Sequence, residues 1–354
     1  MMDNRLHGIL LALLSAALFG ASTPFAKLLL GAMRPTTLAG LLYLGAGSGL
    51  AVALAVRALL GFRRAEAPLT ATDWPWLAGV IIAGGLVGPI LLMVGLQATP
   101  AASTALLLNL ESLFTLLIAW LVFHENVDRR VGLGALAILV GAVVLSWQGD
   151  FGGLQPGALA VAGACLAWAI DNNLTRKLAA ADPMMIVMVK GAVAGPVTLA
   201  IAAAVGEPFP TPGLAVAACV LGAIGYGGSL IGFVLALRYL GAARTGAYFA
   251  TAPFLGAAIA VALLNETLTP QLIVAGALML VGVYLHLTER HDHAHVHSFM
   301  SHEHRHTHDD HHQHPHGLND PPDEPHAHVH VHTRLEHTHP HYPDIHHRHR
   351  HGNG

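Results

Sequence analysis

Three ionisable side chains stand inside apolar stretches of the sequence, where an isolated charge is costly. Glu111 stands in LLLNLESLF, Asp171 in AWAIDNNLTRKL and Lys190 in MVKGAVAG. A charged group in such surroundings must pair with an opposite charge, reach water or change its protonation. The three residues predict a site for proton transfer or substrate binding, and the alternative for Glu111 is structural hydrogen bonds to neighbouring helices. The position of Lys190 near the end of its span favours a side chain that extends to the membrane surface, and the alternative is a charge pair with Asp171 or Glu111.

Asparagines accompany both acids. Asn172 and Asn173 follow Asp171, and successive helical residues are about 100° apart, so the three groups cover much of the helix circumference. Lipid cannot face all three, which predicts a cavity or an interruption of the helix. The structural alternative is a pair between Asp171 and a basic residue of the following TRKL. Asn109 points about 200° away from Glu111, which favours a hydrogen bond to a neighbouring helix, although it stays a site candidate.

Histidine dominates the end of the chain. Only His7, His124 and His286 precede residue 291, which leaves 23 of the 26 histidines in residues 291–354. Neutral imidazole is a good ligand for zinc, nickel, cobalt and copper. The first and densest run predicts a metal-binding segment made of His291, His293, His295, His297, His302, His304, His306, His308, His311, His312, His314 and His316. So polar a composition leaves nothing to form a core, and the tail is predicted to be disordered.

The rest of the chain is too apolar and too poor in charge for a soluble protein. Of the 354 residues, 54% are apolar and 11% are charged, and the mean hydropathy is +0.54. Soluble domains are about one quarter charged. No nucleotide-binding glycine loop, HExxH motif or nucleophile elbow stands out. The sequence therefore predicts an integral membrane protein that is not an enzyme, requires no cofactor and binds no nucleic acid.

Ten segments are long and apolar enough to cross a bilayer, which takes about 20 helical residues. No strand-like alternation accompanies them, so the predicted fold is an all-α membrane protein. The ten segments cover residues 8–30, 36–60, 74–96, 101–123, 130–147, 156–178, 184–205, 213–238, 242–264 and 270–287.

Basic residues mark one side of the membrane. With the N-terminus inside, the inner connections carry Arg57, Arg63, Arg64, Arg129, Arg130, Arg176, Lys177, Arg238, Arg244 and Arg290. The outer connections carry Arg34, with Lys27 near the first of them. Because Lys and Arg are retained on the cytoplasmic side, both termini are predicted to lie in the cytoplasm, beneath a bacterial inner membrane.

The two halves of the membrane part resemble each other. A shift of 141 residues matches Thr104 with Thr245 and Glu125 with Glu266. Each half has five spans, an odd number, so the second half must be inverted relative to the first. The predicted units are a first five-helix repeat in 1–148, a second in 149–290, and the tail in 291–354. Both glutamates stand at helix ends, where a carboxylate satisfies the free N–H groups of the following helix.

The paired elements also resemble a known family. Each half has an early FG or WA span followed by a basic residue, Lys27 or Arg176. Each then has a glutamate before a glycine-containing span, in LVFHENVDRRVGLGALAILVGAVVLS and ALLNETLTPQLIVAGALMLVGVYL. Over residues 8–287 this pattern resembles the EamA-like branch of the drug/metabolite transporter superfamily. The resemblance implies ten helices, two inverted repeats, a central cavity and mostly export of small metabolites, amino acids or drugs. It does not imply the histidine tail.

Three functions fit these features. The first is a secondary transporter that exports a small organic metabolite by alternating access, coupled to protons through Glu111, with the tail as a cytoplasmic metal-binding appendage. The second is a transporter of divalent nickel, cobalt or zinc whose tail loads or senses the ion. The third is a membrane-anchored metal store. The expected partners are the lipid bilayer, the small-molecule or ion substrate and metal ions at the tail, and a homodimer is left open.

Overall fold

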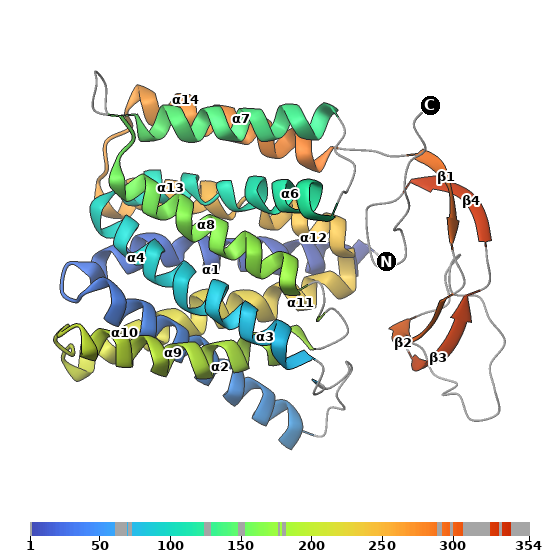
Figure 1. Cartoon of the computed structure of the whole chain (residues 1–354), viewed down its shortest axis with the longest axis horizontal. Coiled ribbons are helices and arrows are strands. Elements are labelled where there is room, and N and C mark those ends of the chain that lie inside the picture. Colours follow the sequence, from blue (N-terminus) through green and yellow to red (C-terminus); the bar gives the residue numbers. More distant parts are fainter. Residues whose placement is uncertain are drawn as a thin grey trace.

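The structure is a computed structural model, and its helices run along a common direction (Figure 1). It describes residues 2–60, 69, 73–123, 129–147, 153–175, 178, 182–288, 292–297, 300–306, 326–332 and 335–340. The helix α1 begins, and α14 ends, at the same end of the bundle (Figure 1). We call the opposite end, where residues 99–100, 205–211 and 265–269 connect successive spans, the far end.

Ten spans follow one another, and four of them are built from more than one helical segment. The segments are α1 (Met2–Leu30), α2 (Pro35–Leu59), α3 (Trp74–Val80) with the π-helical η2 (Ile81–Val87) and α4 (Gly88–Ala98), α5 (Ala101–Leu107) with α6 (Leu110–Phe123), α7 (Arg129–Ser146), α8 (Pro156–Thr175), α9 (Pro183–Ala204), α10 (Pro212–Gly222) with the π-helical η5 (Ala223–Gly228) and α11 (Ser229–Leu240), α12 (Ala242–Phe249) with α13 (Ala252–Leu264), and α14 (Pro270–Leu287). The prediction of an all-α membrane protein with ten spans is confirmed.

Nine of these spans, among the described residues, are long and apolar enough to cross a membrane by length and composition. The tenth is α8, whose last turns carry Asp171, Asn172 and Asn173. The span that is least suited to lipid is therefore the one that carries three of the six predicted site residues, as expected for a helix that faces the interior of a bundle.

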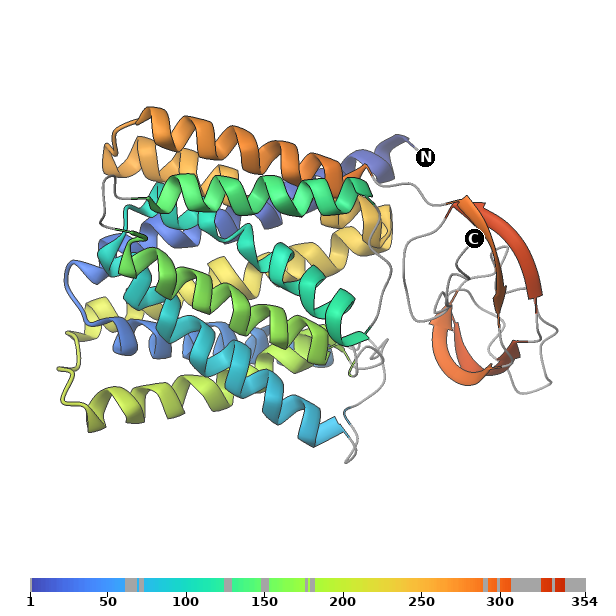
Figure 2. The same ribbon diagram turned by 45° about the horizontal axis from the view of Figure 1, so that its top comes forward.

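The two halves interlock as inverted repeats. The helix α1 packs against α11 and α13 of the second half, and its counterpart α8 packs against α4 and α6 of the first half. The pairs α2 with α9 and α7 with α14 complete the arrangement, and α7 and α14 lie side by side at one edge of the bundle (Figures 1 and 2). Small residues allow this packing, since a Cβ atom on Gly191 would lie 2.6 Å from the amide nitrogen of Gly47.

Irregular helix geometry recurs at related positions of the two halves. The third span of each half contains a π-helical segment, η2 or η5. The fourth span of each half is interrupted, between α5 and α6 at Leu108–Asn109 and between α12 and α13 at Ala250–Thr251. Discontinuous helices and π-bulges are frequent at transport and binding sites. Of the two alternatives for the polar groups around Asp171, a cavity or an interruption of the helix, the interruption is not found, because α8 continues as a regular helix to Thr175.

The tail differs from the prediction of disorder in four short segments. The strands are β1 (Asp292–His297), β2 (Met300–His306), β3 (His326–His332) and β4 (Leu335–Pro340). They form two antiparallel pairs, β1 with β4 and β2 with β3. The His-x-His pattern has a period of two, which is also the period of a strand.

Candidate functional site

An ion pair inside the bundle joins α8 to α9. The ammonium nitrogen of Lys190 lies 2.7 Å from the Asp171 Oδ2 atom, and the two side chains are 12% and 7% exposed. The hydroxyl of Thr175, one turn further along α8, donates to the other carboxylate oxygen at 3.1 Å. Lys190 thus pairs with Asp171, and the prediction that its side chain extends to the membrane surface is wrong. Because the pair is buried, both partners are needed to keep either charge tolerable.

Glu111 lies beside this pair and joins the two halves. Its Oε1 atom accepts a hydrogen bond of 2.8 Å from the side-chain amide of Asn172. The same amide also lies 3.4 Å from the Thr115 hydroxyl, one turn below Glu111 on α6. Glu111 interacts electrostatically with both Asp171 and Lys190. The structure therefore brings together four of the six predicted site residues.

Gly84, in the π-helical η2, supports the ion pair and was missed by sequence reasoning. Its carbonyl oxygen accepts two hydrogen bonds, from the Tyr43 hydroxyl at 2.7 Å and from the Trp168 indole N–H at 3.1 Å. A Cβ atom on Gly84 would overlap the Asp171 carboxylate, so only glycine leaves room for the pair here. The sole signal in the sequence is the pair of glycines in VIIAGGLVGP, within an otherwise apolar span.

The two remaining predicted asparagines differ in where they lie. The Asn109 side-chain amide donates to the Leu106 carbonyl of its own span at 2.8 Å, and it lies 3.9 Å from the Met279 sulfur on α14. The expected bond to a neighbouring helix is therefore the weaker of its two contacts. Asn173 lies beside the Glu111–Asn172 contact, since its amide donates to the Thr115 carbonyl of α6 at 3.3 Å and to the Ala169 carbonyl at 2.8 Å. Within the described residues its buried side-chain oxygen has no hydrogen-bond partner.

Asn109 has a counterpart in the second half. The Thr251 hydroxyl donates to the Tyr248 carbonyl at 2.6 Å, three residues back, as Asn109 does to Leu106. In each case a side chain supplies the donor where the helix is interrupted. The two polar residues therefore stabilise the related interruptions of the fourth spans, a role that α-helical spacing alone did not indicate.

An aromatic cluster, defined as Phe19, Tyr43, Tyr226, Phe233 and Phe249, adjoins the polar residues. The ring centroids are 5.9 Å apart for Tyr43–Tyr226, 6.0 Å for Phe19–Tyr226, 5.5 Å for Phe19–Phe249 and 5.1 Å for Phe233–Phe249. All five side chains are half-buried. The cluster draws on both halves of the chain, and its member Tyr43 also holds Gly84.

Glu266 connects the halves at the far end. Its two carboxylate oxygens accept from the backbone N–H groups of Ala101 and Ala102 at 2.7 and 2.8 Å. It thus caps α5 of the first half, and the predicted capping of its own following helix is wrong. That helix, α14, is capped instead by the Thr269 hydroxyl, which accepts from the Leu272 N–H at 3.1 Å. The related Glu125 lies outside the described residues.

Lys27 stabilises the same turn between α4 and α5 by binding the end of α4. Its ammonium group donates to the carbonyls of Leu96, Gln97 and Thr99, where α4 ends. The turn from α4 to α5 is therefore held between a cation at the C-terminus of one helix and a carboxylate at the N-terminus of the next, as helix dipoles favour.

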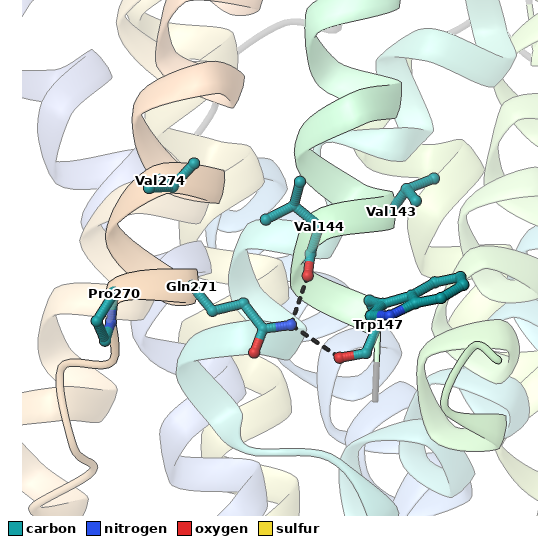
Figure 3. Close-up of a pocket in the computed structure, with 6 residues that line it drawn as sticks. All are labelled: Val143, Val144, Trp147, Pro270, Gln271 and Val274. Atoms are coloured by element: carbon teal, nitrogen blue, oxygen red, sulfur yellow. Dashed lines mark hydrogen bonds between the residues drawn. The ribbon is translucent and has the colours of Figure 1, made fainter. Parts of the chain in front are cut away.

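A second contact between the halves at the far end involves Gln271. Its side-chain amide donates to the carbonyls of Val144 and Trp147, where α7 ends, beside a mainly apolar groove of about 450 Å³ (Figure 3). Figure 3 shows the Gln271 side chain of α14 directed at the carbonyls of Val144 and Trp147 of α7, with the Val144 side chain on the same side and the Trp147 ring on the side away from α14. The groove lies at the edge of the bundle and contains none of the predicted site residues.

Glu207 makes the third contact between the halves at the far end, and its surroundings predict a pH effect. Its Oε2 atom accepts from the N–H and the hydroxyl of Thr37, both at 2.8 Å. Burial alone would raise the pKa of the Glu207 carboxyl, but hydrogen bonds from Thr37 and Thr36 outweigh it and hold the pKa below its ordinary value. A carboxyl of this kind stabilises the fold above its unfolded pKa, about 4.3, and this stabilisation is lost as the pH falls through the lower folded value.

We therefore expect acid to destabilise the wild-type protein more than the Glu207→Gln variant. The check is the thermal unfolding temperature of both proteins in detergent as the pH is lowered from about 5 to about 3. Parallel curves for the two proteins would contradict the assignment, since Gln cannot titrate.

Loss of one partner of the buried ion pair is expected to destabilise the fold more than loss of both partners. Asp171→Asn leaves the Lys190 ammonium without its carboxylate, and such a loss destabilises a protein by about 3–5 kcal/mol. The double variant Asp171→Asn, Lys190→Met removes both charges and should recover most of that stability. Thermal unfolding of the two single variants and the double variant checks this, and additive losses would contradict it.

The fold and the site define a helical membrane transporter, with polar groups held between two inverted repeats and helix irregularities around them. The family comparison is more specific. The EamA-like transporter family matches residues 6–147 and again residues 155–288, and the chain belongs to this family.

Similar proteins agree with this assignment. An uncharacterized transporter of Methanothermobacter thermautotrophicus (strain ATCC 29096) is 30% identical over 297 residues, which is 80% of this chain and 86% of that protein. A protein of known crystal structure is 22% identical, with a TM-score of 0.57 over 79% of this chain and 95% of its own. The second similarity concerns the fold alone.

Proposed function

We propose that this protein is a secondary transporter that exports a small organic metabolite by alternating access, coupled to protons through Glu111. One observation carries the proposal: Glu111 and Asn172 bond across the two repeats, beside the Asp171–Lys190 pair. A carboxyl that sits on the boundary between two moving halves can bind a proton in one state and release it in the other. The Asn172 amide favours the ionised carboxyl, so protonation of Glu111 weakens this link.

The contacts at the far end support a two-state motion. Glu266, Glu207 and Gln271, all from the second half, hold the ends of α5, α2 and α7 of the first half. Opening of the far end has to break these hydrogen bonds together. The basic loops indicate that both termini lie in the cytoplasm, beneath a bacterial inner membrane. The far end then faces outward, and these three contacts close the described state on that side.

Reconstitution into proteoliposomes tests the proposal. Solute flux would be measured with and without an imposed pH gradient, for pools of labelled small metabolites and separately for nickel, cobalt and zinc. Flux of an organic solute that accelerates with the gradient supports the proposal. Saturable metal flux that requires Glu111 would replace it by the metal transporter, and gradient-independent solute flux would remove the proton coupling.

An organic substrate is favoured over a metal ion by the chemistry of the core. Within the described residues, no group of three or more His, Cys, Asp or Glu side chains could hold a metal ion. Glu111, Asp171 and Lys190 offer two carboxylates and an ammonium group, and the last would repel a divalent cation. A transition-metal pathway or a pure metal store would need neither the aromatic cluster nor this ion pair.

The tail is proposed to bind zinc, nickel, cobalt or copper without taking part in transport. The register of β2 and β3 sets three histidines of each strand opposite one another, in the pairs His302–His330, His304–His328 and His306–His326. Residues directly opposite in antiparallel strands stand side by side on one face. The side chains of all predicted tail ligands lie outside what the structure describes, and His291, His308, His311, His312, His314 and His316 do so entirely.

Truncation after Arg290 is expected to abolish high-capacity metal binding and leave proton-driven solute flux unchanged. The reason is that the site lies wholly within the helical part, while the ligands lie beyond it. Metal content after dialysis and flux in proteoliposomes check the two expectations. A truncated protein that transports more slowly than the full chain would contradict the separation of roles.

A further inference from the structure

When Glu111 is ionised, the polar site holds one negative charge more than its own residues neutralise. Lys190 lies 2.7 Å from Asp171 and is engaged by it. Glu111 receives only the neutral amide of Asn172, and among the residues that the structure describes it has no cation in contact. Two acids thus share one base. A ligand that completes this site must bring a positive charge to Glu111, and a ligand carboxylate would find Lys190 already occupied.

The aromatic cluster sits next to this unbalanced carboxylate. Tyr43 links the two parts, because its hydroxyl is held by Gly84 and interacts electrostatically with Glu111 and Asp171, while its ring contacts Tyr226. The rings continue through Phe19 to α11 and α12, so helices from both halves contribute faces. Aromatic faces attract cations and also pack against flat apolar groups.

We infer that the transported metabolite is an organic monocation, an amine whose ammonium group pairs with Glu111 and whose aromatic or similarly flat apolar body packs in the aromatic cluster. This inference rests on the proposed function, because it names the substrate class of the same site. It also explains the coupling: ammonium and proton compete for one carboxylate, so the two occupy Glu111 in alternation. The Asp171–Lys190 pair stays intact and excludes anionic and zwitterionic competitors.

Four probes that share a phenyl ring on a short chain separate the charge classes. Purified full-length protein would be tested for binding of 2-phenylethylamine, the neutral 2-phenylethanol, the anion phenylacetate and the zwitterion phenylalanine. We expect the amine to bind about tenfold or more tightly than each of the others, the gain typical of one desolvated charge contact. Equal or tighter binding of any of the other three, or no saturable binding of the amine, would overturn the inference.

Variants test the two parts of the proposed binding site, the Glu111 carboxylate and the aromatic cluster. Glu111→Gln should remove the preference for the amine over 2-phenylethanol, while Phe19→Leu should weaken both ligands by a similar factor. The matched control is Phe25→Leu on the same helix, since Phe25 is 43% exposed on the outside of the helical core and lies outside the aromatic cluster. If Phe25→Leu weakens binding as much as Phe19→Leu, the cluster is not the binding surface.

Flux distinguishes this inference from the proposed function. An amine that binds selectively but never crosses the bilayer would refute proton-coupled transport of this class and leave the charge selectivity of the site standing. Proton-driven flux of a neutral or anionic metabolite would support the transporter and overturn the cationic substrate. Proton-driven flux of 2-phenylethylamine that loses its dependence on the gradient in Glu111→Gln supports both.

Discussion

Proton-driven solute flux is expected to fall to the level of empty liposomes when Glu111 is replaced by Gln. The substitution keeps the size of the side chain and an oxygen that can accept from the Asn172 amide. In the wild-type protein this amide lies 2.8 Å from the Glu111 carboxylate. The substitution removes only the ability to ionise. If the carboxyl takes up and releases the coupling proton, net transport against a gradient should stop, and exchange of solute for solute, which moves no proton, should persist at a reduced rate.

Two measurements make this expectation specific. Counterflow in the absence of a pH gradient reports the exchange, and an enclosed pH-sensitive dye reports proton movement in the same vesicles. The matched control is Ser112→Ala, the neighbouring residue on α6, whose hydroxyl donates to the Asn109 carbonyl at 2.8 Å. Glu111→Gln protein that still accumulates solute at the wild-type rate would remove Glu111 from the coupling mechanism.

The sequence identified the charged part of the site because polar residues inside apolar spans are rare and costly. Glu111, Asp171, Asn172 and Lys190 were found in this way, and the structure brings them together. The same argument could not find Gly84, because its importance depends on a π-helical turn that sets its carbonyl between two aromatic donors. Hydrophobic periodicity does not distinguish a π turn from an α turn in so apolar a span.

Glu266 illustrates a second limit of prediction from the sequence, the choice of the helix that a capping residue binds. Glu266 stands four residues before α14, and local rules assign it to the N-terminus of that helix. Thr269 is closer and already accepts from Leu272, so the carboxylate is free to reach Ala101 and Ala102 of the other half. Tertiary contacts between inverted repeats decide the partner, and no single-sequence pattern encodes them. Lys27 was noted as a family feature, but its three carbonyl acceptors could be seen only in the folded chain.

Gly84→Ala is expected to reduce solute flux about a hundredfold, the loss that a displacement of about 1 Å can cause at a reacting site. The added methyl group would occupy the position of the Asp171 carboxylate. Either Asp171 moves away from Lys190, which breaks the 2.7 Å contact between the charges, or η2 moves away from α8 and loosens the packing around the pair. The carbonyl of residue 84 would shift as well, which releases Tyr43 and Trp168.

Gly132→Ala is the matched control, because a Cβ atom at Gly132, in α7, meets nothing within 4 Å. Flux and thermal unfolding would be measured for both variants. A folded Gly84→Ala protein with low flux and a wild-type unfolding temperature for Gly132→Ala would show that the space beside η2 belongs to the ion pair. If Gly84→Ala transports at the wild-type rate, Asp171 tolerates displacement, and the pair cannot be the fixed element against which Glu111 exchanges its proton.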